Sequence, residues 1–225
     1  MLPDVTLEAV KKSIAFKEDI RVIRTSVNHP EISLIIQPIE KNKVKTFEGL
    51  YFVLDKVINS SEKGNLHALS DILKTIIYFE SKAVINKALA CIRGWLVQLG
   101  YDIKAVSLAT KSYHSTTADK DKELVMLEFQ KEGQQSVHRI LLATDSLGIG
   151  IDLPDISRVV QWKLPKQRDD ALEIMWQRFG RVARGPEKAG EAILLAEQWF
   201  WGPRETRKQG FKANKVSVSD IEDSD

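Results

Sequence analysis

Short apolar runs alternate along the chain with longer stretches in which apolar residues recur at helical spacing. Runs of strand length lie at Ile32–Ile39, Thr75–Phe79, Ile103–Leu108, His138–Thr144, Arg158–Trp162 and Glu191–Ala196. Between them the spacing predicts helices at Phe47–Ile58, Lys82–Leu99, Ala118–Gln130 and Asp169–Phe179. Strands separated by helices form parallel sheets with right-handed crossovers. The pattern therefore predicts an α/β fold in which a parallel β-sheet carries helices on both faces.

Apolar stripes indicate which face each of the two longer helices buries. In the helix Lys82–Leu99 the stripe consists of Val84, Ala88, Ile92, Trp95 and Leu99. The helix Ala118–Gln130 offers the core Leu124, Leu127 and Phe129. Cys91 falls beside the first stripe, so we expect it to pack in the core and not to serve as a reactive thiol.

Composition narrows the class of protein. The chain has 225 residues, of which 43% are hydrophobic and 28% charged, as in ordinary globular domains. The net charge of +2 is weak, so a nucleic-acid surface would require local clustering of basic residues. Cys91 is the single cysteine, which excludes an internal disulfide and a cysteine-based zinc site. We expect no membrane segment, no secretion and a reducing compartment, because no long apolar stretch or secretory signal occurs.

A polar loop with glycines follows the predicted strand His138–Thr144. Thr144 and Ser146 place hydroxyl groups at the carboxyl end of this strand, where open α/β sheets bind their ligands. Hydroxyl and backbone N–H groups at such a place suit phosphate. Gly148 and Gly150 allow the backbone to turn and to approach an anion closely. These residues predict a phosphate-binding loop.

Two arginines, Arg181 and Arg184, follow the predicted helix Asp169–Phe179. Residues three apart are neighbours on a helical or turn surface, so the pair can point at one target. Their planar guanidinium groups suit a bound phosphate or the charge that develops on a transferring phosphoryl group. The other interpretation is a solvated helix end with Gly185-Pro186 as its stop signal.

The loop and the arginines together resemble motifs V and VI of superfamily-two helicases, in order and spacing. The matching residues are Ala143-Thr144, Gly148-Ile149-Gly150-Ile151-Asp152, Gln177 and Gly180-Arg181-x-x-Arg184. Their particular form is similar to the RecQ-type DNA helicases. Upstream, Thr75–Ser81 resembles the motif IV strand, and Tyr113-His114-Ser115 resembles the segment that these helicases carry next. Two residues depart from the pattern. Ala183 stands where the family usually has glycine, and Asp152 stands where RecQ proteins often have asparagine and other helicase groups have aspartate.

The resemblance implies a RecA-like second motor lobe that contributes half of a nucleotide site. Arg181 and Arg184 would reach across the cleft between two lobes to the γ-phosphate as arginine fingers. Gln177 would lie in the same cleft, and Asp152 would contact the nucleotide ribose, beside Gly150. These roles follow from the matching motif positions only.

The same resemblance implies single-stranded DNA as a partner. Thr144, Ser146 and Gly148 would hold its phosphates, and Ser81 is a weaker candidate of the same kind. The sequence contains no G-x-x-x-x-G-K-[ST] loop and no Asp-Glu magnesium element. We therefore expect ATP and Mg²⁺ to bind only when a missing N-terminal RecA-like lobe is present, and we expect this chain to bind no metal itself.

The expected function is that of the second motor lobe of a 3′-5′ RecQ-like DNA helicase, inactive without its first lobe. Such an enzyme implies DNA repair or recombination, in the nucleus of a eukaryote or otherwise in the cytoplasm. The alternative is a non-catalytic module, derived from a helicase lobe, that binds nucleic acid or a protein. A first lobe encoded in frame upstream of Met1 would favour the helicase.

Three parts of the chain are expected to differ in role. Residues 1–45 form the connection between lobes and the leading strands, residues 46–201 form the RecA-like lobe, and residues 202–225 form a charged tail for which we expect disorder. Trp199, Phe200 and Trp201 end the lobe. Aromatic residues at the end of a domain can stack on bases, but packing on the core or on a partner is the favoured interpretation.

Overall fold

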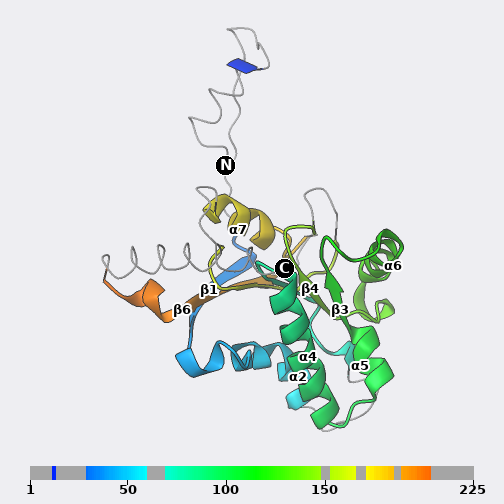
Figure 1. The fold of residues 1–225 in the computed structure, drawn as a ribbon. Helices are drawn as coiled ribbons and strands as arrows, with labels where there is room; N and C mark the ends of the chain where they lie inside the picture. Colours follow the sequence, from blue (N-terminus) through cyan, green and yellow to red (C-terminus); the bar gives the residue numbers. More distant parts are fainter. Residues whose placement is uncertain are drawn as a thin grey trace, which may run out of the picture. The chain divides into compact units, whose positions relative to one another are not determined.

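A six-stranded parallel sheet organises the structure, in the order β1-β6-β5-β2-β4-β3 (Figure 1). The computed structural model describes residues 12–13, 29–59, 69–147, 153–165, 171–184 and 189–203. The strands are β1 (Ile32–Ile39), β2 (Thr75–Tyr78), β3 (Thr110–Tyr113), β4 (Ile140–Ala143), β5 (Arg158–Trp162) and β6 (Gly190–Glu197). They all belong to the compact unit Glu31–Asp225. The domain boundaries proposed from the sequence stay predictions.

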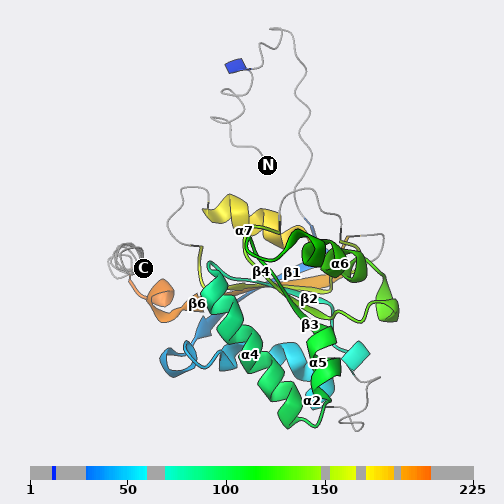
Figure 2. The ribbon, with the colours of Figure 1, turned by 45° about the vertical axis from the view of Figure 1, so that its right-hand side comes forward.

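Helices cover both faces of this sheet (Figures 1 and 2). One face carries the 3₁₀ helix η2 (Glu48–Leu54), α2 (Asp55–Ile58), α4 (Lys82–Gln98) and α5 (Ile103–Ala109), and the other carries α6 (Asp119–Phe129) and α7 (Ala171–Phe179). The short 3₁₀ helices are η1 (Lys41–Lys43), η3 (Gly133–Gln135) and η4 (Gln198–Trp201). Within the described ranges, no helix has the length and apolar character needed to cross a membrane. The predicted RecA-like α/β fold is confirmed.

Strand β4 is apolar throughout, and the central strands β2 and β5 are apolar except for Thr75, Arg158 and Gln161, whose polar atoms are hydrogen-bonded. Every residue in these strands is buried, because helices exclude water from both faces. Side chains alternate between two cores, so that Ile77 and Leu142 pack on the α4 side and Ile76 and Leu141 on the α6 and α7 side. Tyr78, at the end of β2, lies level with the neighbouring ends of β4 and β5. Residues that follow these strands therefore reach one common edge.

Ile103–Leu108 is helical, so the strand predicted there is wrong. The Asp102 carboxylate caps α5 by accepting hydrogen bonds from the backbone N–H groups of Lys104 at 2.8 Å and Ala105 at 3.1 Å. Strand β3 begins only at Thr110, after the helix has ended. A cap at this position satisfies N–H groups that a helix start leaves without partners, which outweighs the weak strand preference of the short apolar run.

Replacing Asp102 with alanine is expected to lower the free energy of unfolding by about 0.5–2 kcal/mol, because the cap of α5 is lost. Urea unfolding followed by circular dichroism measures the change. Glu123→Ala is the control, since Glu123 is an exposed side chain inside α6. Equal stability of Asp102→Ala and the parent chain would contradict the assigned cap.

The predicted stripe of α4 is confirmed, because Ala88 and Ile92 are buried and its other three residues pack against the same core. The prediction for α6 is confirmed for Phe129 and wrong for Leu124 and Leu127. Helix α4 buries Ile85, Ala88, Leu89, Ile92 and Leu96. Helix α6 buries Met126 and Phe129, whereas Leu124 and Leu127 are each 56% exposed. Apolar residues occupy adjacent positions in both helices, so their spacing fits two neighbouring faces. Cys91 is half-buried against the core, as expected.

Candidate functional site

Side chains from separate parts of the chain meet at the carboxyl ends of β2, β4 and β5. Glu80 follows β2, Asp145 follows β4, Gln161 lies in β5, and Arg178 comes from α7. Strand β2 lies between β4 and β5, so the three ends adjoin. The carboxyl edge of a parallel sheet is the usual ligand-binding edge of such folds.

Arg178 is the centre of this cluster and is 5% exposed. Its Nη2 donates to Asp145 Oδ1, and its Nη1 donates to Gln161 Oε1 and, at 3.4 Å, to Glu80 Oε1. The guanidinium carbon lies 4.8 Å from the centre of the Tyr78 ring, within cation–π range. Arg178 therefore connects α7 to the ends of three strands.

Sequence analysis missed Arg178, although its position on α7 carries a signal. Met175 and Phe179 are buried on the same helix, three positions before Arg178 and one after it. A basic residue on a core-facing stripe has to be paired, because arginine is almost never fully buried without a partner. The spacing of apolar residues along α7 would not have identified the residues that pair with Arg178.

Tyr78, whose ring contacts Arg178, carries an uncharged hydroxyl group. Burial raises the pKa of Tyr78, while the positive charges of Arg181 and Arg178 act in the opposite direction. Its side chain is 1% exposed. The ring thus offers Arg178 an aromatic face and adds no negative charge to the site.

Thr144 and Ser146 form a tight turn directly after β4. Their hydroxyl oxygens lie 2.9 Å apart, and the backbone N–H of Leu147 donates to the Thr144 carbonyl at 3.1 Å. The turn is tied to β3, because the Thr144 N–H donates to the Tyr113 carbonyl at 3.2 Å. Both hydroxyl-bearing residues are half-buried, and Asp145 between them is exposed. The structure therefore brings two of the predicted phosphate contacts together.

Ser81 begins α4 and has a structural role of its own. Its hydroxyl oxygen accepts a hydrogen bond from the backbone N–H of Val84 at 3.4 Å and caps the helix. Ser81 directly follows Glu80, which contacts Arg178. Its predicted contact with nucleic acid stays a prediction.

Arg181 and Arg184 lie in the turn after α7 and differ sharply in environment. Arg181 is 6% exposed, and its Nη2 donates to the Leu147 carbonyl at 3.3 Å. Arg184 is exposed, and its Nε donates to the Gly180 carbonyl at 3.2 Å. The two side chains therefore have different surroundings in this turn, and the prediction that they meet one phosphate stays a prediction.

Ala183, between Arg181 and Arg184, changes the direction of the backbone. Its φ of 58° is in the left-handed region, which glycine adopts without steric cost and alanine does not. Its N–H donates to the Ile156 carbonyl at 3.2 Å, which holds the turn against the segment before β5. This geometry accounts for the glycine that the resemblance predicts at position 183, and it shows that alanine is accommodated.

Of the other residues predicted to contact the nucleotide or the strand, only Gln177 lies within the described part of the chain. Gln177 is exposed on α7, one residue before Arg178. Gly148, Gly150 and Asp152 lie outside the described residues. Among the residues that the structure describes, no cluster of histidine, cysteine and carboxylate side chains could hold a metal ion.

Aromatic residues at the end of the lobe pack as expected. Trp199 and Phe200 are half-buried against the core on the α7 side of the sheet. Their rings make an edge contact with centres 6.4 Å apart. Trp201 is 48% exposed. Core packing therefore accounts for two of the three aromatic side chains.

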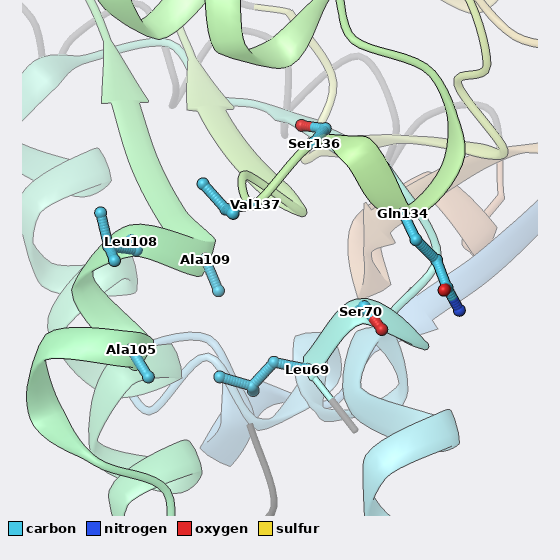
Figure 3. Close-up of a pocket in the computed structure, with 8 residues that line it drawn as sticks. All are labelled: Leu69, Ser70, Ala105, Leu108, Ala109, Gln134, Ser136 and Val137. Atoms are coloured by element: carbon cyan, nitrogen blue, oxygen red, sulfur yellow. The ribbon is translucent and has the colours of Figure 1, made fainter. Parts of the chain in front are cut away.

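A small apolar cavity of about 190 Å³ lies where the strands begin, at the end of the sheet opposite the cluster around Arg178 (Figure 3). Its lining residues precede β2, β3 and β4 in the chain and are Leu69, Ser70, Ala105, Leu108, Ala109, Gln134, Ser136 and Val137. Figure 3 shows the Leu69 side chain extending toward Ala105. The lining has no charged group to bind a phosphate, so the cavity is separate in place and chemistry from the cluster around Arg178.

Comparison with known proteins agrees with the motifs. The family described as helicase conserved C-terminal domain matches residues 64–186, more than half of the chain. DEAD-box ATP-dependent RNA helicase 38 of Arabidopsis thaliana is 26% identical over 214 residues, which cover 92% of this chain and 40% of that protein. The ATP-dependent RNA helicase eIF4A of Aspergillus clavatus is 24% identical over 186 residues, or 80% of this chain and 42% of that protein. The chain thus spans about two fifths of these relatives' length.

Solved structures share the fold. A Dbp5 variant of S. cerevisiae bound to RNA and ADP BeF3 has a TM-score of 0.58 at 19% identity, covering 95% of this chain and 47% of that chain. Domain 2 of the Mss116p DEAD-box helicase, bound to an RNA duplex, has a TM-score of 0.55 at 16% identity, covering 80% and 60%. The two relatives are RNA helicases by name, and both solved structures contain bound RNA. The finer prediction of a RecQ-like DNA helicase therefore stays a prediction.

Proposed function

This chain belongs to the helicase C-terminal domain family of superfamily-two helicases, and we propose that it serves as the second motor lobe of an ATP-driven enzyme that moves along a single nucleic-acid strand. In this proposal Thr144 and Ser146 hold strand phosphates, and Arg181 and Arg184 meet the γ-phosphate of ATP bound by a first lobe. Gln177 lies near the same nucleotide. ATP and Mg²⁺ are held mainly by the first lobe, so this lobe alone does not turn over ATP.

One observation carries this proposal. The two hydroxyl groups that suit strand phosphates and the carbonyl that holds Arg181 belong to four consecutive residues, Thr144 to Leu147. A shift of this turn on strand binding therefore changes the environment of a candidate arginine finger directly. A motor requires such a connection between its strand contacts and its nucleotide contacts, whereas a simple binding module does not.

The second candidate is a non-catalytic module that keeps only the strand or protein contacts. Burial of Arg181 favours this non-catalytic candidate. A side chain that is 6% exposed and hydrogen-bonded to Leu147 is not positioned to reach a nucleotide on another lobe. In the motor proposal, docking of the first lobe or binding of a strand releases this contact. Activity of a reconstituted two-lobe protein distinguishes the two candidates.

For the strand we propose single-stranded DNA, gripped in a RecQ-like manner with 3′-5′ polarity. The order and spacing of the motifs support DNA through their resemblance to RecQ-type enzymes. The named relatives favour RNA instead. Binding assays with both polymers therefore decide between them.

Single-strand binding by the chain is expected to depend on Thr144 and on salt. Thr144→Ala should weaken binding on the order of tenfold, because a hydrogen bond to a charged group contributes about 1.5–3 kcal/mol. Affinity should fall with rising salt and show little dependence on base sequence, as phosphate contacts do. Fluorescence anisotropy with labelled oligothymidylate and oligouridylate measures both effects.

The control for this experiment is Ser33→Ala, which removes an exposed hydroxyl from the edge strand β1. It should bind as the parent chain does. Tighter binding of oligouridylate than of oligothymidylate would replace the DNA assignment with RNA. Binding that does not change in Thr144→Ala, or does not respond to salt, would contradict the proposed strand contacts.

A further inference from the structure

Two carboxylates lie directly beside the hydroxyl groups proposed to hold phosphates. Asp145 stands between Thr144 and Ser146, and Glu80 directly precedes Ser81. The Asp145 side chain is 52% exposed and that of Glu80 is 23% exposed. Like charges repel strongly at a few ångströms in a partly desolvated site. An uncompensated carboxylate at either position would therefore oppose the approach of a phosphate.

A single buried cation contacts both carboxylates. Arg178 donates from Nη2 to Asp145 and from Nη1 to Glu80, the latter at 3.4 Å. A guanidinium group supplies a positive charge that can offset a carboxylate. Gln161 and the Tyr78 ring contribute a neutral acceptor and an aromatic face, so they hold the guanidinium without adding negative charge.

We infer that Arg178 is a positioning residue that neutralises Asp145 and Glu80 and thereby allows a nucleic-acid phosphate to bind the hydroxyl groups beside them. Arg178 itself is 5% exposed, so it acts on the phosphate through the two carboxylates. The same hydrogen bonds orient the turn after β4. The inference rests on the proposed function, because it requires strand phosphates at Thr144 and Ser146.

A purely structural role for Arg178 makes a different prediction. If Arg178 only stabilised the fold, removal of the Asp145 charge would not restore binding to a variant that lacks Arg178. If Arg178 neutralises charge, the loss should be repaired when the carboxylate becomes an amide of the same shape. A double-mutant cycle therefore separates the two roles.

The experiment measures binding of labelled oligothymidylate and oligouridylate to the whole chain by fluorescence anisotropy. Arg178→Gln should weaken binding on the order of tenfold at low salt, and the deficit should shrink as salt screens the exposed carboxylate. Asp145→Asn alone should bind at least as tightly as the parent. The double variant Arg178→Gln/Asp145→Asn should recover most of the affinity that Arg178→Gln loses.

The matched control is Arg158→Gln. Arg158 is 4% exposed and also pairs with two carboxylates, those of Glu191 at 2.7 Å and Asp55 at 3.4 Å, but on the α2 side of the sheet. Its replacement should leave strand affinity unchanged in protein shown by thermal unfolding to be folded. If Arg178→Gln does not fold, Asp145→Asn decides the question, since weaker binding than the parent overturns the inference.

Failure of the inference can be told from failure of the proposed function. A parent chain that binds neither polymer refutes the proposed strand contacts and the inference with them. A parent that binds and loses affinity in Thr144→Ala supports the function. In that case, a double variant no tighter than Arg178→Gln, or an Arg178→Gln variant as tight as the parent, overturns the inference alone.

Discussion

Replacing Arg181 with lysine in a two-lobe fusion is expected to lower nucleic-acid-stimulated ATP hydrolysis on the order of 10³-fold or more, the range of arginine-finger losses in phosphoryl transfer. The fusion joins a first lobe of a RecQ-like helicase ahead of Met1. Lysine keeps the positive charge but lacks the planar donor fork that spans phosphate oxygens. Arg184→Lys should cause a loss of the same order. Steady-state hydrolysis with a saturating single strand measures both.

Two controls accompany this experiment. Arg93→Lys changes a half-buried arginine of α4 that donates to the Thr110 hydroxyl and carbonyl, both at 2.9 Å. It should keep most of the activity. The chain without a first lobe should hydrolyse no ATP above background. A folded, nucleotide-binding fusion indifferent to Arg181→Lys and Arg184→Lys would favour the non-catalytic module.

Replacing Phe79 with alanine is expected to lower the free energy of unfolding by about 3–5 kcal/mol, as for other buried aromatic residues. Phe79 is fully buried, and its ring centre lies 6.3 Å from that of Phe47 and 6.4 Å from that of Trp162. The cavity left by truncation opens between β2, β5 and the segment that precedes η2. The midpoint temperature of thermal unfolding should fall by about 10 °C, because each kcal/mol lowers it by roughly 2–4 °C in a domain of this size.

Leu127→Ala is the control for Phe79→Ala and also tests the assigned face of α6. Leu127 is 56% exposed, so its truncation should change stability by no more than about 0.5 kcal/mol. A loss comparable with that of Phe79→Ala would mean that α6 buries the face predicted from sequence. A small effect for both variants would contradict the core position of Phe79.

The amino-acid sequence by itself determined the elements whose signals are local. Strand β4 was predicted because a strand buried on both faces is apolar along its length, whatever its neighbours are, and Val159 and Val160 indicated β5. The Thr144 and Ser146 hydroxyl groups were predicted as a site because they directly follow such a strand. Motif order identified Arg181 and Arg184 as candidate nucleotide contacts, and their predicted roles stay predictions.

Only the tertiary structure decided which residues meet Arg178. Glu80, Asp145 and Gln161 lie 98, 33 and 17 residues away from it in the chain. The order of the strands in the sheet brings them together, and this order cannot be read from the spacing of residues along the sequence. The left-handed backbone at Ala183 is likewise a tertiary feature, because an alanine in the sequence gives no local signal of that conformation. Local preferences specify elements, whereas long-range packing specifies which charges share a site, because pairing energies depend on distance in space.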